Sequence, residues 1–280
     1  MKNIQSILKI SALALVASAF AFSCSDDDDN NNNAPGFTGE SKTYTLVETD
    51  DSNISGTAQF RERTDGSMVV TVDLEGTTSG QSYPVFIRSN SASETGVMIA
   101  ELEPVSGATG TSATILSERD NGTALTYDQV LALNGTLVVT ESDETVVSQT
   151  DIGSNELTAT SRTYTLSSVG DSDVAGTVVF TKRMNGNTVV TTNLTGTSTG
   201  TTYPVMIYNS SISTPGTAAV MLNSVNGSTG TTASSTTNVS SQIGGTAITY
   251  DQLNTFNGHI GVGEAGSYSA STNIGSNDLP

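Results

Sequence analysis

Apolar and polar residues alternate along much of the chain, and this pattern predicts short β-strands. The clearest run is residues 68–75, where the apolar side carries Met68, Val70, Val72 and Leu74. The same period of two recurs at 98–102 and 137–139, with apolar residues at every second position. A period of two is typical of a strand with one buried face, and many short strands between Gly and Asn turns indicate a sandwich or barrel. The sequence therefore predicts an all-β protein.

Two kinds of local signal punctuate the strands. Asp65-Gly66 and Asn185-Gly186 precede alternating runs, and both dipeptides favour the positive φ angles of a tight hairpin turn. Residues 126–133 have instead a helical pattern, with Thr126 as a candidate cap and an Asn-Gly pair after the segment. We expect one short helix here and one in the matching segment near residue 250.

An internal repeat accounts for everything after the first 39 residues. Residues 41–113 match residues 161–233 at a constant offset of 120, and the later segments match after small changes in loop length. Each unit has the length of an ordinary domain. We expect a first domain at 40–158 and a second at 159–280, joined by a connection of a few residues at 159–161.

The N-terminus has the features of an export signal. Lys2 and Lys9 supply positive charge, and residues 10–22 form an uncharged apolar run that is too short to span a bilayer. The run ends at Ser23-Cys24, and Cys24 is the single cysteine of the chain. This order of features predicts a signal peptide at 1–23.

The position of Cys24 resembles a bacterial lipobox, in which the cysteine after the apolar run is acylated and becomes the first residue of the mature chain. The alternative is an ordinary secretory peptide with an incidental cysteine. Residues 24–39 contain four Asp and four Asn and have little to bury, so we expect a disordered tether. The acidic cluster after Cys24 is similar to the surface-export signal of Bacteroidota lipoproteins. We therefore expect attachment to the outer membrane through lipid on Cys24, facing the cell surface, with the periplasmic face as second choice.

Charge narrows the range of partners. Without residues 1–23 the chain has 8 basic and 28 acidic residues, a net charge of −20, which disfavours nucleic acid and anionic lipid. The repeats differ, because 40–158 carries a net charge of −14 and 159–280 carries −2. If a partner is recognised by charge, the two domains are not equivalent, and the nearly neutral second repeat is the better candidate for an adhesive face.

Each repeat resembles the CHRD domain, which is in turn similar to the Greek-key β-sandwich of copper/zinc superoxide dismutase. The resemblance covers nearly all of each repeat. It depends on an ordered series of short motifs that occurs twice: G-T-x-x-F, V-x-V-x-L-x-G-T, Y-P-V-x-I, L-x-x-V-x-G-x-T-G, T-Y-D-Q and I-G-S-N. The resemblance implies two tandem Greek-key β-sandwich or barrel domains, each with one short helix.

The resemblance also implies positions for copper ligands, and this chain lacks the ligands there. In the dismutase, the strand equivalent to the one that begins Tyr83-Pro84-Val85 here carries a His-x-His pair, and a later strand supplies another histidine. The matching residues here are Phe86, Arg88 and Thr140 in the first repeat and Met206, Tyr208 and Gly263 in the second. Copper redox sites use imidazole nitrogen donors. We therefore expect no cofactor and no metal.

Other candidate residues have structural interpretations. His259, the single histidine, is expected to be a solvated strand residue, because a catalytic metal normally needs three protein ligands. Tyr83 and Tyr203 are expected to pack, with a binding role as the alternative. Asp50-Asp51 and Asp171-Ser172-Asp173 are expected to be turn residues, although they could suggest calcium.

The sequence contains no recognisable catalytic motif, and it leaves the function open. The leading hypothesis is a non-enzymatic surface module for display, adhesion or binding of an extracellular protein or glycan. The alternatives are a cryptic metal-binding protein or a hydrolase that uses carboxylates, and a subunit of a larger surface complex. Fold alone does not choose among these, because function belongs to sites.

Overall fold

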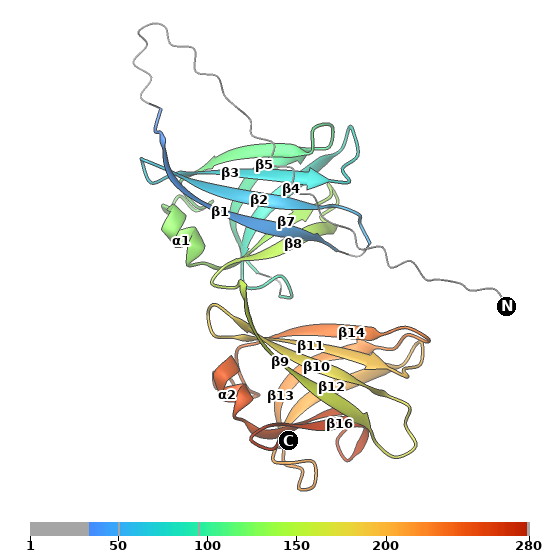
Figure 1. Ribbon diagram of the computed structural model, residues 1–280. Coiled ribbons are helices and arrows are strands. Elements are labelled where there is room, and N and C mark those ends of the chain that lie inside the picture. The colour runs from blue at the N-terminus through green and yellow to red at the C-terminus, as the bar shows by residue number, and fades with distance from the viewer. Residues whose placement is uncertain (1–33, 50, 95, 279–280) are drawn as a thin grey trace, which may run out of the picture. The chain divides into compact units, whose positions relative to one another are not determined.

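The computed structural model describes residues 34–49, 51–94 and 96–278 (Figure 1). The predicted signal peptide, Cys24 and the predicted tether as far as residue 33 lie outside the described residues. Within the described part, no helix has the length and apolar character needed to cross a membrane. The protein is all-β, with two eight-stranded antiparallel sheets and two short helices, as the alternating pattern predicts.

Each repeat contributes eight strands and one helix. The first repeat contains β1 (Phe37–Glu48), β2 (Ser55–Arg63), β3 (Met68–Glu75), β4 (Ser82–Ser89), β5 (Met98–Ser106), β6 (Thr111–Leu116), α1 (Tyr127–Leu131), β7 (Asn134–Thr140) and β8 (Val146–Gly153). The second contains β9 (Leu157–Ser168), β10 (Ala175–Arg183), β11 (Thr188–Thr195), β12 (Thr202–Asn209), β13 (Ala218–Asn226), β14 (Ala233–Val239), α2 (Tyr250–Asn254), β15 (Asn257–Glu264) and β16 (Ser267–Gly275).

The two sheets share one topology. The strand order is β5-β4-β7-β8-β1-β2-β3-β6 in the first repeat and β13-β12-β15-β16-β9-β10-β11-β14 in the second. The pairs β3–β6 and β4–β7 join non-consecutive strands, as in a Greek key. Side chains help to close each barrel between its outermost strands. For example, the Glu103 N–H on β5 donates to Oγ1 of Thr114 on β6 at 2.8 Å.

Each repeat has its own core, built from the apolar sides of its strands. On β3 the predicted inward residues Met68, Val70, Val72 and Leu74 are all buried. The matching positions of β11 are also buried, although two of them are threonines. Met98 departs from the expected pattern and is 49% exposed, because it opens β5 beside a shift in strand register. Each repeat thus contains one buried apolar cluster made only of its own residues.

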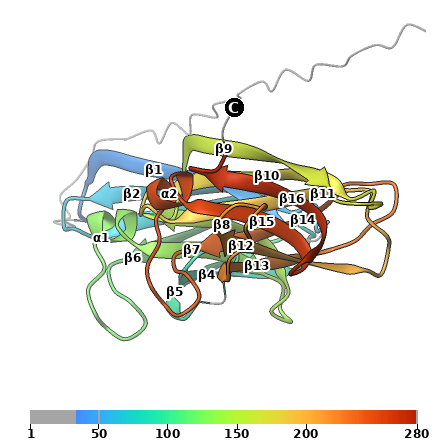
Figure 2. The same ribbon diagram turned by 90° about the horizontal axis from the view of Figure 1, so that it is seen from below.

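The turns and helices follow their local sequence. Gly66 and Gly186 have φ angles of 81° and 85° in the hairpins that join β2 to β3 and β10 to β11. Thr126 and Thr249 begin the helices with capping boxes, in which Gln at the third helical position returns a hydrogen bond. Each helix contacts two strands of its own repeat, α1 with β2 and β8 and α2 with β10 and β16 (Figure 1 and Figure 2).

The strands that open the repeats begin slightly before the boundaries expected from sequence. β1 starts at Phe37, inside the segment predicted to be tether, and β9 starts at Leu157. Residues 159–161 are therefore part of β9 and do not form a separate connection. The backbone of the first repeat continues directly into the second, and the Met184 N–H donates to the Glu156 carbonyl at 2.9 Å beside this passage.

Candidate functional site

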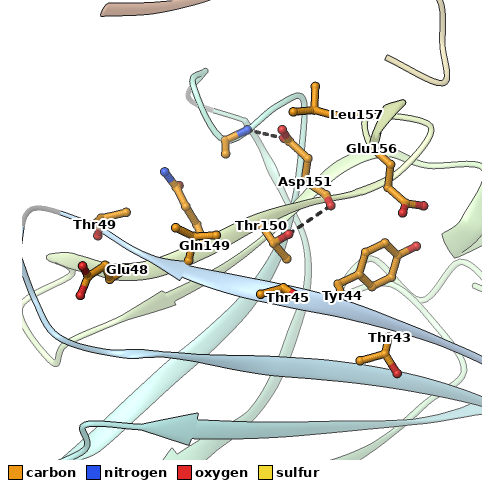
Figure 3. A pocket seen from close by; sticks show the side chains of 12 residues that line it. Thr43, Tyr44, Thr45, Glu48, Thr49, Gln149, Thr150, Asp151, Glu156 and Leu157 are labelled. Atoms are coloured by element: carbon orange, nitrogen blue, oxygen red, sulfur yellow. Dashed lines mark hydrogen bonds between the residues drawn. The ribbon is translucent and has the colours of Figure 1, made fainter. Parts of the chain in front are cut away.

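Each repeat has an open seam in the middle of its strand order, because β1 pairs with β8, and β9 with β16, at only two positions. β1 pairs with β2 from Ser41 to Leu46, but it pairs with β8 only at Val47 and Glu48. Beyond those two residues the facing edges of β1 and β8 separate around a groove of about 530 Å³ (Figure 3). Unpaired strand edges carry free N–H and C=O groups and are templates for an added strand.

The groove has both apolar and acidic lining. Val47 and Leu157 at its walls are 60% and 53% exposed. Glu48, Asp151 and Glu156 also line it. Asp151 forms an ion pair with Arg183 at 2.7 Å, and Glu156 forms one with Lys42 at 2.7 Å. Two of the three carboxylates are therefore paired with cations.

Tyr44 limits the groove at its inner side. Its ring is 4% exposed and meets Phe60 edge-on, with the ring centroids 5.5 Å apart. The Gly153 N–H donates to the Tyr44 hydroxyl at 3.1 Å and so bridges the gap between β1 and β8. Burial is the main cause that raises the pKa of Tyr44 to about 12. This hydrogen bond joins β1 to β8 at a point where the two strands are not paired by backbone hydrogen bonds.

A second hollow adjoins the groove on the outer face of β4, β7 and β8. Its volume is about 200 Å³, and it shares Ala92 and Gln149 with the groove lining. The cavity, which we call the Arg88 pocket, is lined by Arg88, Ala92, Ser93, Glu94, Gly96, Thr136, Val138, Val146 and Gln149. The lining thus contains one guanidinium, from Arg88, and one carboxylate, from Glu94, and its other residues are uncharged.

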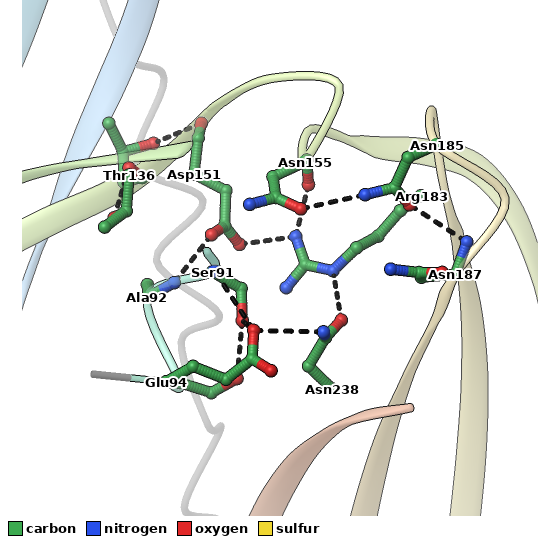
Figure 4. A network of polar contacts seen from close by, with 12 residues as sticks. Ser91, Ala92, Glu94, Thr136, Asp151, Asn155, Arg183, Asn185, Asn187 and Asn238 are labelled. Carbon is green, nitrogen blue, oxygen red and sulfur yellow. Dashed lines mark hydrogen bonds and ion pairs between the residues drawn. The ribbon is translucent and has the colours of Figure 1, made fainter. Parts of the chain in front are cut away.

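A polar network supports the wall between the two hollows (Figure 4). One carboxylate oxygen of Asp151 accepts from the Ala92 N–H at 2.8 Å, and the other pairs with Arg183. Nε of Arg183 donates to Asn238 at 2.8 Å, and Nη1 also donates to the Asn155 carbonyl. Arg183 is only 2% exposed, so its charge depends on these partners.

Glu94 is held by the same network. Its Oε2 accepts from the N–H and the hydroxyl of Ser91, at 3.1 and 2.6 Å, and from Nδ2 of Asn238 at 3.1 Å. The loop that forms one wall of the Arg88 pocket is thereby fixed through both Glu94 and Ala92. The first repeat therefore presents a supported concave surface.

The matching face of the second repeat is filled by aromatic side chains. Tyr208 stacks on the His259 ring with centroids 5.1 Å apart, and the Tyr268 hydroxyl lies 3.1 Å from Nε2 of His259. Nδ1 of His259 is 2.8 Å from the Ser210 carbonyl oxygen. The prediction that His259 is solvated was wrong, because these two tyrosines cover it and leave it 0% exposed. Strand alternation places a residue on the outer face but does not reveal what covers that face.

The positions matched to copper ligands lie on β4 and β7 in the first repeat, and on β12 and β15 in the second. Phe86 and Arg88 are both on β4, on the face opposite to the core residues Val85 and Ile87. Arg88 pairs across the strands with Thr136 of β7, while Thr140 lies at the far end of β7. In the part of the chain that the structure describes, no three His, Cys, Asp or Glu side chains form a group that could hold a metal.

The other candidate residues have local structural roles. The hydroxyls of Tyr83 and Tyr203 accept the N–H groups of Thr78 and Ser198, and both rings are buried, which confirms the packing interpretation. Asp51 has a φ of 57°, as expected in a turn, whereas Asp50 lies outside the described residues. Asp171 lies in the turn after β9, where the Ser172 N–H donates to the Val169 carbonyl at 3.3 Å, and Asp173 lies between this turn and β10.

Sequence reasoning did not identify Arg183 or the groove. The repeat itself contained a signal, because Arg63 and Arg183 are both arginines at the offset of 120. Arg63 binds the Pro35 carbonyl just before β1, as Arg183 binds the Asn155 carbonyl just before β9. An identical charge in both repeats was thus a sign of a common structural contact.

Comparisons with known proteins do not identify the chain. No family model, curated protein or solved structure matches it. The relation to CHRD domains therefore remains a prediction from the motifs quoted above.

Proposed function

We propose that the protein is a lipid-anchored surface protein that binds, without catalysis, an extended segment of an extracellular protein in the groove of its first repeat. The observation that carries this proposal is the open seam, where β1 and β8 pair at only two positions beside a groove of about 530 Å³. An extended peptide can add to such edges through main-chain hydrogen bonds, while pockets beside the edge select its side chains.

The groove lining supports a peptide that carries both apolar and basic residues. Val47 and Leu157 offer apolar contact, and Glu48 is a carboxylate without an ion-pair partner within 4.0 Å among the described residues. The net charge of −14 in this repeat favours a peptide whose net charge is positive. The second repeat has the same two-residue seam between β9 and β16, but it has a serine, Ser167, in place of Val47. We therefore assign the binding role to the first repeat and not to the nearly neutral second repeat that charge alone favours.

Anchoring through Cys24 is the first part of the proposal to test. Cys24→Ser removes the acylated thiol, and the variant should leave the membrane fraction, because acyl chains contribute about 0.8 kcal/mol for each buried methylene. Protease treatment of intact cells should digest the wild-type protein if it faces outward. A Cys24→Ser protein that still sediments with outer membranes would contradict the anchor.

Binding in the groove can be tested with linear peptides selected from a displayed library against the purified 34–280 chain. Val47→Lys places a charge in the groove and should reduce affinity for the selected peptides at least about tenfold. Ile115→Lys is the matched control, because Ile115 is 65% exposed on β6 and does not line the groove. Equal affinities of the two variants, or failure to select any peptide, would contradict the proposal.

A further inference from the structure

We infer that the Arg88 pocket binds a carboxylate group, with Arg88 as its principal ligand. The inference deepens the proposed function and rests on it for the source of that carboxylate, which would belong to the peptide in the adjoining groove. The two hollows share Ala92 and Gln149, so one extended ligand can reach both.

In the second repeat the protein's own aromatic side chains occupy the same face. Tyr208, His259 and Tyr268 pack together there, and the ring of Tyr268 lies over Gly261. A Cβ on Gly261 would lie 2.4 Å from that ring, so the glycine is required for the ring to fit. This arrangement closes the face with the protein's own side chains.

The first repeat has a different residue at each of these positions. The repeat alignment and the strand register match Tyr208 to Arg88, His259 to Thr136, Gly261 to Val138 and Tyr268 to Val146. Three aromatic rings are thus replaced by one arginine and two smaller side chains, and Val138 occupies the place of the glycine. The result is a cavity of about 200 Å³ with the arginine at its wall.

Arg88 is partly buried, and its Cζ lies 5.5 Å from the centroid of the Phe86 ring. Its Nε is buried and makes no hydrogen bond, and its charge has no carboxylate within 4.0 Å among the described residues. By contrast, Arg63, Arg162 and Arg183 all donate hydrogen bonds to oxygen atoms. A buried donor without a partner is destabilising, and charged donors more so. An anion in the cavity would satisfy Arg88.

The pocket selects a carboxylate among the anions. A guanidinium presents parallel N–H groups that match the two oxygens of a carboxylate. Only one cation lines the pocket, and Glu94 adds a negative charge to the lining, which disfavours a dianion such as hydrogen phosphate. The Gln149 amide is a further donor at the boundary with the groove.

Acetate is the simplest probe, because its binding does not depend on any peptide. We would add sodium acetate to the ¹⁵N-labelled 34–280 chain, with sodium chloride at equal ionic strength as reference. Resonances of Arg88, Thr136 and Gln149 should shift, while those of Tyr208 and His259 should not. Arg88→Gln should weaken acetate binding at least about tenfold, since a charge-assisted hydrogen bond is worth about 1.5 kcal/mol or more.

Two matched variants separate a pocket from general charge. Arg61→Gln makes the same charge change at an exposed arginine that stacks on Phe37, with Cζ 3.8 Å from the ring centroid, and it should bind acetate like the wild type. The pair Val138→Gly and Val146→Tyr copies the second repeat and fills the cavity while keeping Arg88. It should abolish the acetate shifts. Equal weakening in Arg61→Gln, shifts in both repeats, or undiminished binding by the filled variant would overturn the inference.

Selected peptides distinguish the source of the carboxylate. A peptide that presents its C-terminal carboxylate should lose affinity at least about tenfold on C-terminal amidation. A peptide that presents an acidic side chain should lose it on Asp→Asn or Glu→Gln replacement. If peptides bind the groove and neither change matters, the carboxylate inference fails while the proposed function stands. If acetate binds but no peptide does, the proposed function fails and the Arg88 site stands.

Discussion

Removal of the Asp151 carboxylate should destabilise the protein strongly. Arg183 is 2% exposed, and its Nη1 lies 2.7 Å from a carboxylate oxygen of Asp151. Asp151→Ala removes that oxygen. Breaking a buried ion pair from one side costs about 3 to 5 kcal/mol, because the remaining charge stays out of water. The Ala92 N–H loses its acceptor as well. The Asn155 carbonyl and Asn238 still accept from Arg183, so we expect the lower part of that range.

Asp278→Ala is the matched control for this change. Asp278 also pairs with an arginine, Arg162, at 2.8 Å, but the two side chains are 40% and 36% exposed. Exposed pairs contribute about 0 to 1 kcal/mol. Urea unfolding followed by far-ultraviolet circular dichroism would give both changes in the free energy of unfolding. A loss below about 1 kcal/mol for Asp151→Ala, equal to that of the control, would refute the reasoning. Adding Arg183→Met to Asp151→Ala should restore part of the stability, since no unpaired charge then remains.

Three further predictions follow from the separate cores and the buried groups. The pKa of Tyr44 is raised from 10.0 to about 12, so its contribution to stability is complete below pH 10 and is lost as the pH rises toward 12. Between these pH values, the Tyr44→Phe variant should therefore lose less free energy of unfolding than the wild type. Fragments 34–156 and 157–280 should each unfold cooperatively when expressed alone, because each contains a complete core, and a fragment without a cooperative transition would show that the barrels depend on each other. Metal analysis after copper loading should find no stoichiometric copper, because the positions matched to copper ligands lack imidazoles, and one tightly held copper per repeat would contradict this.

The sequence predicted the barrel well because its signals are local and repeated. Alternation identified the buried side of β3, the Asp65-Gly66 turn fixed a hairpin, and the Thr126 cap marked the start of α1. Agreement between two copies of the pattern strengthened each of these assignments.

The candidate site was less accessible to sequence reasoning, because it depends on contacts between distant strands. The seam arises from a pairing of β1 with β8 that is cut to two residues, and alternation within β1 carries no information about that length. His259 was misjudged for the same reason: its burial comes from Tyr208 and Tyr268 on neighbouring strands. The difference between the repeats at Arg88 was visible in the sequence, but its meaning required the cavity.

Hydrogen exchange of the 34–280 chain with and without a selected peptide tests the central claim most directly. Backbone amides of an open strand edge exchange quickly, and an added strand protects them. The account predicts new protection at 43–46 and 150–152, where β1 and β8 do not pair in the first repeat, and none at the matching segments 163–166 and 272–274. Protection confined to the second repeat, or a bound peptide that protects neither edge of the groove, would contradict it.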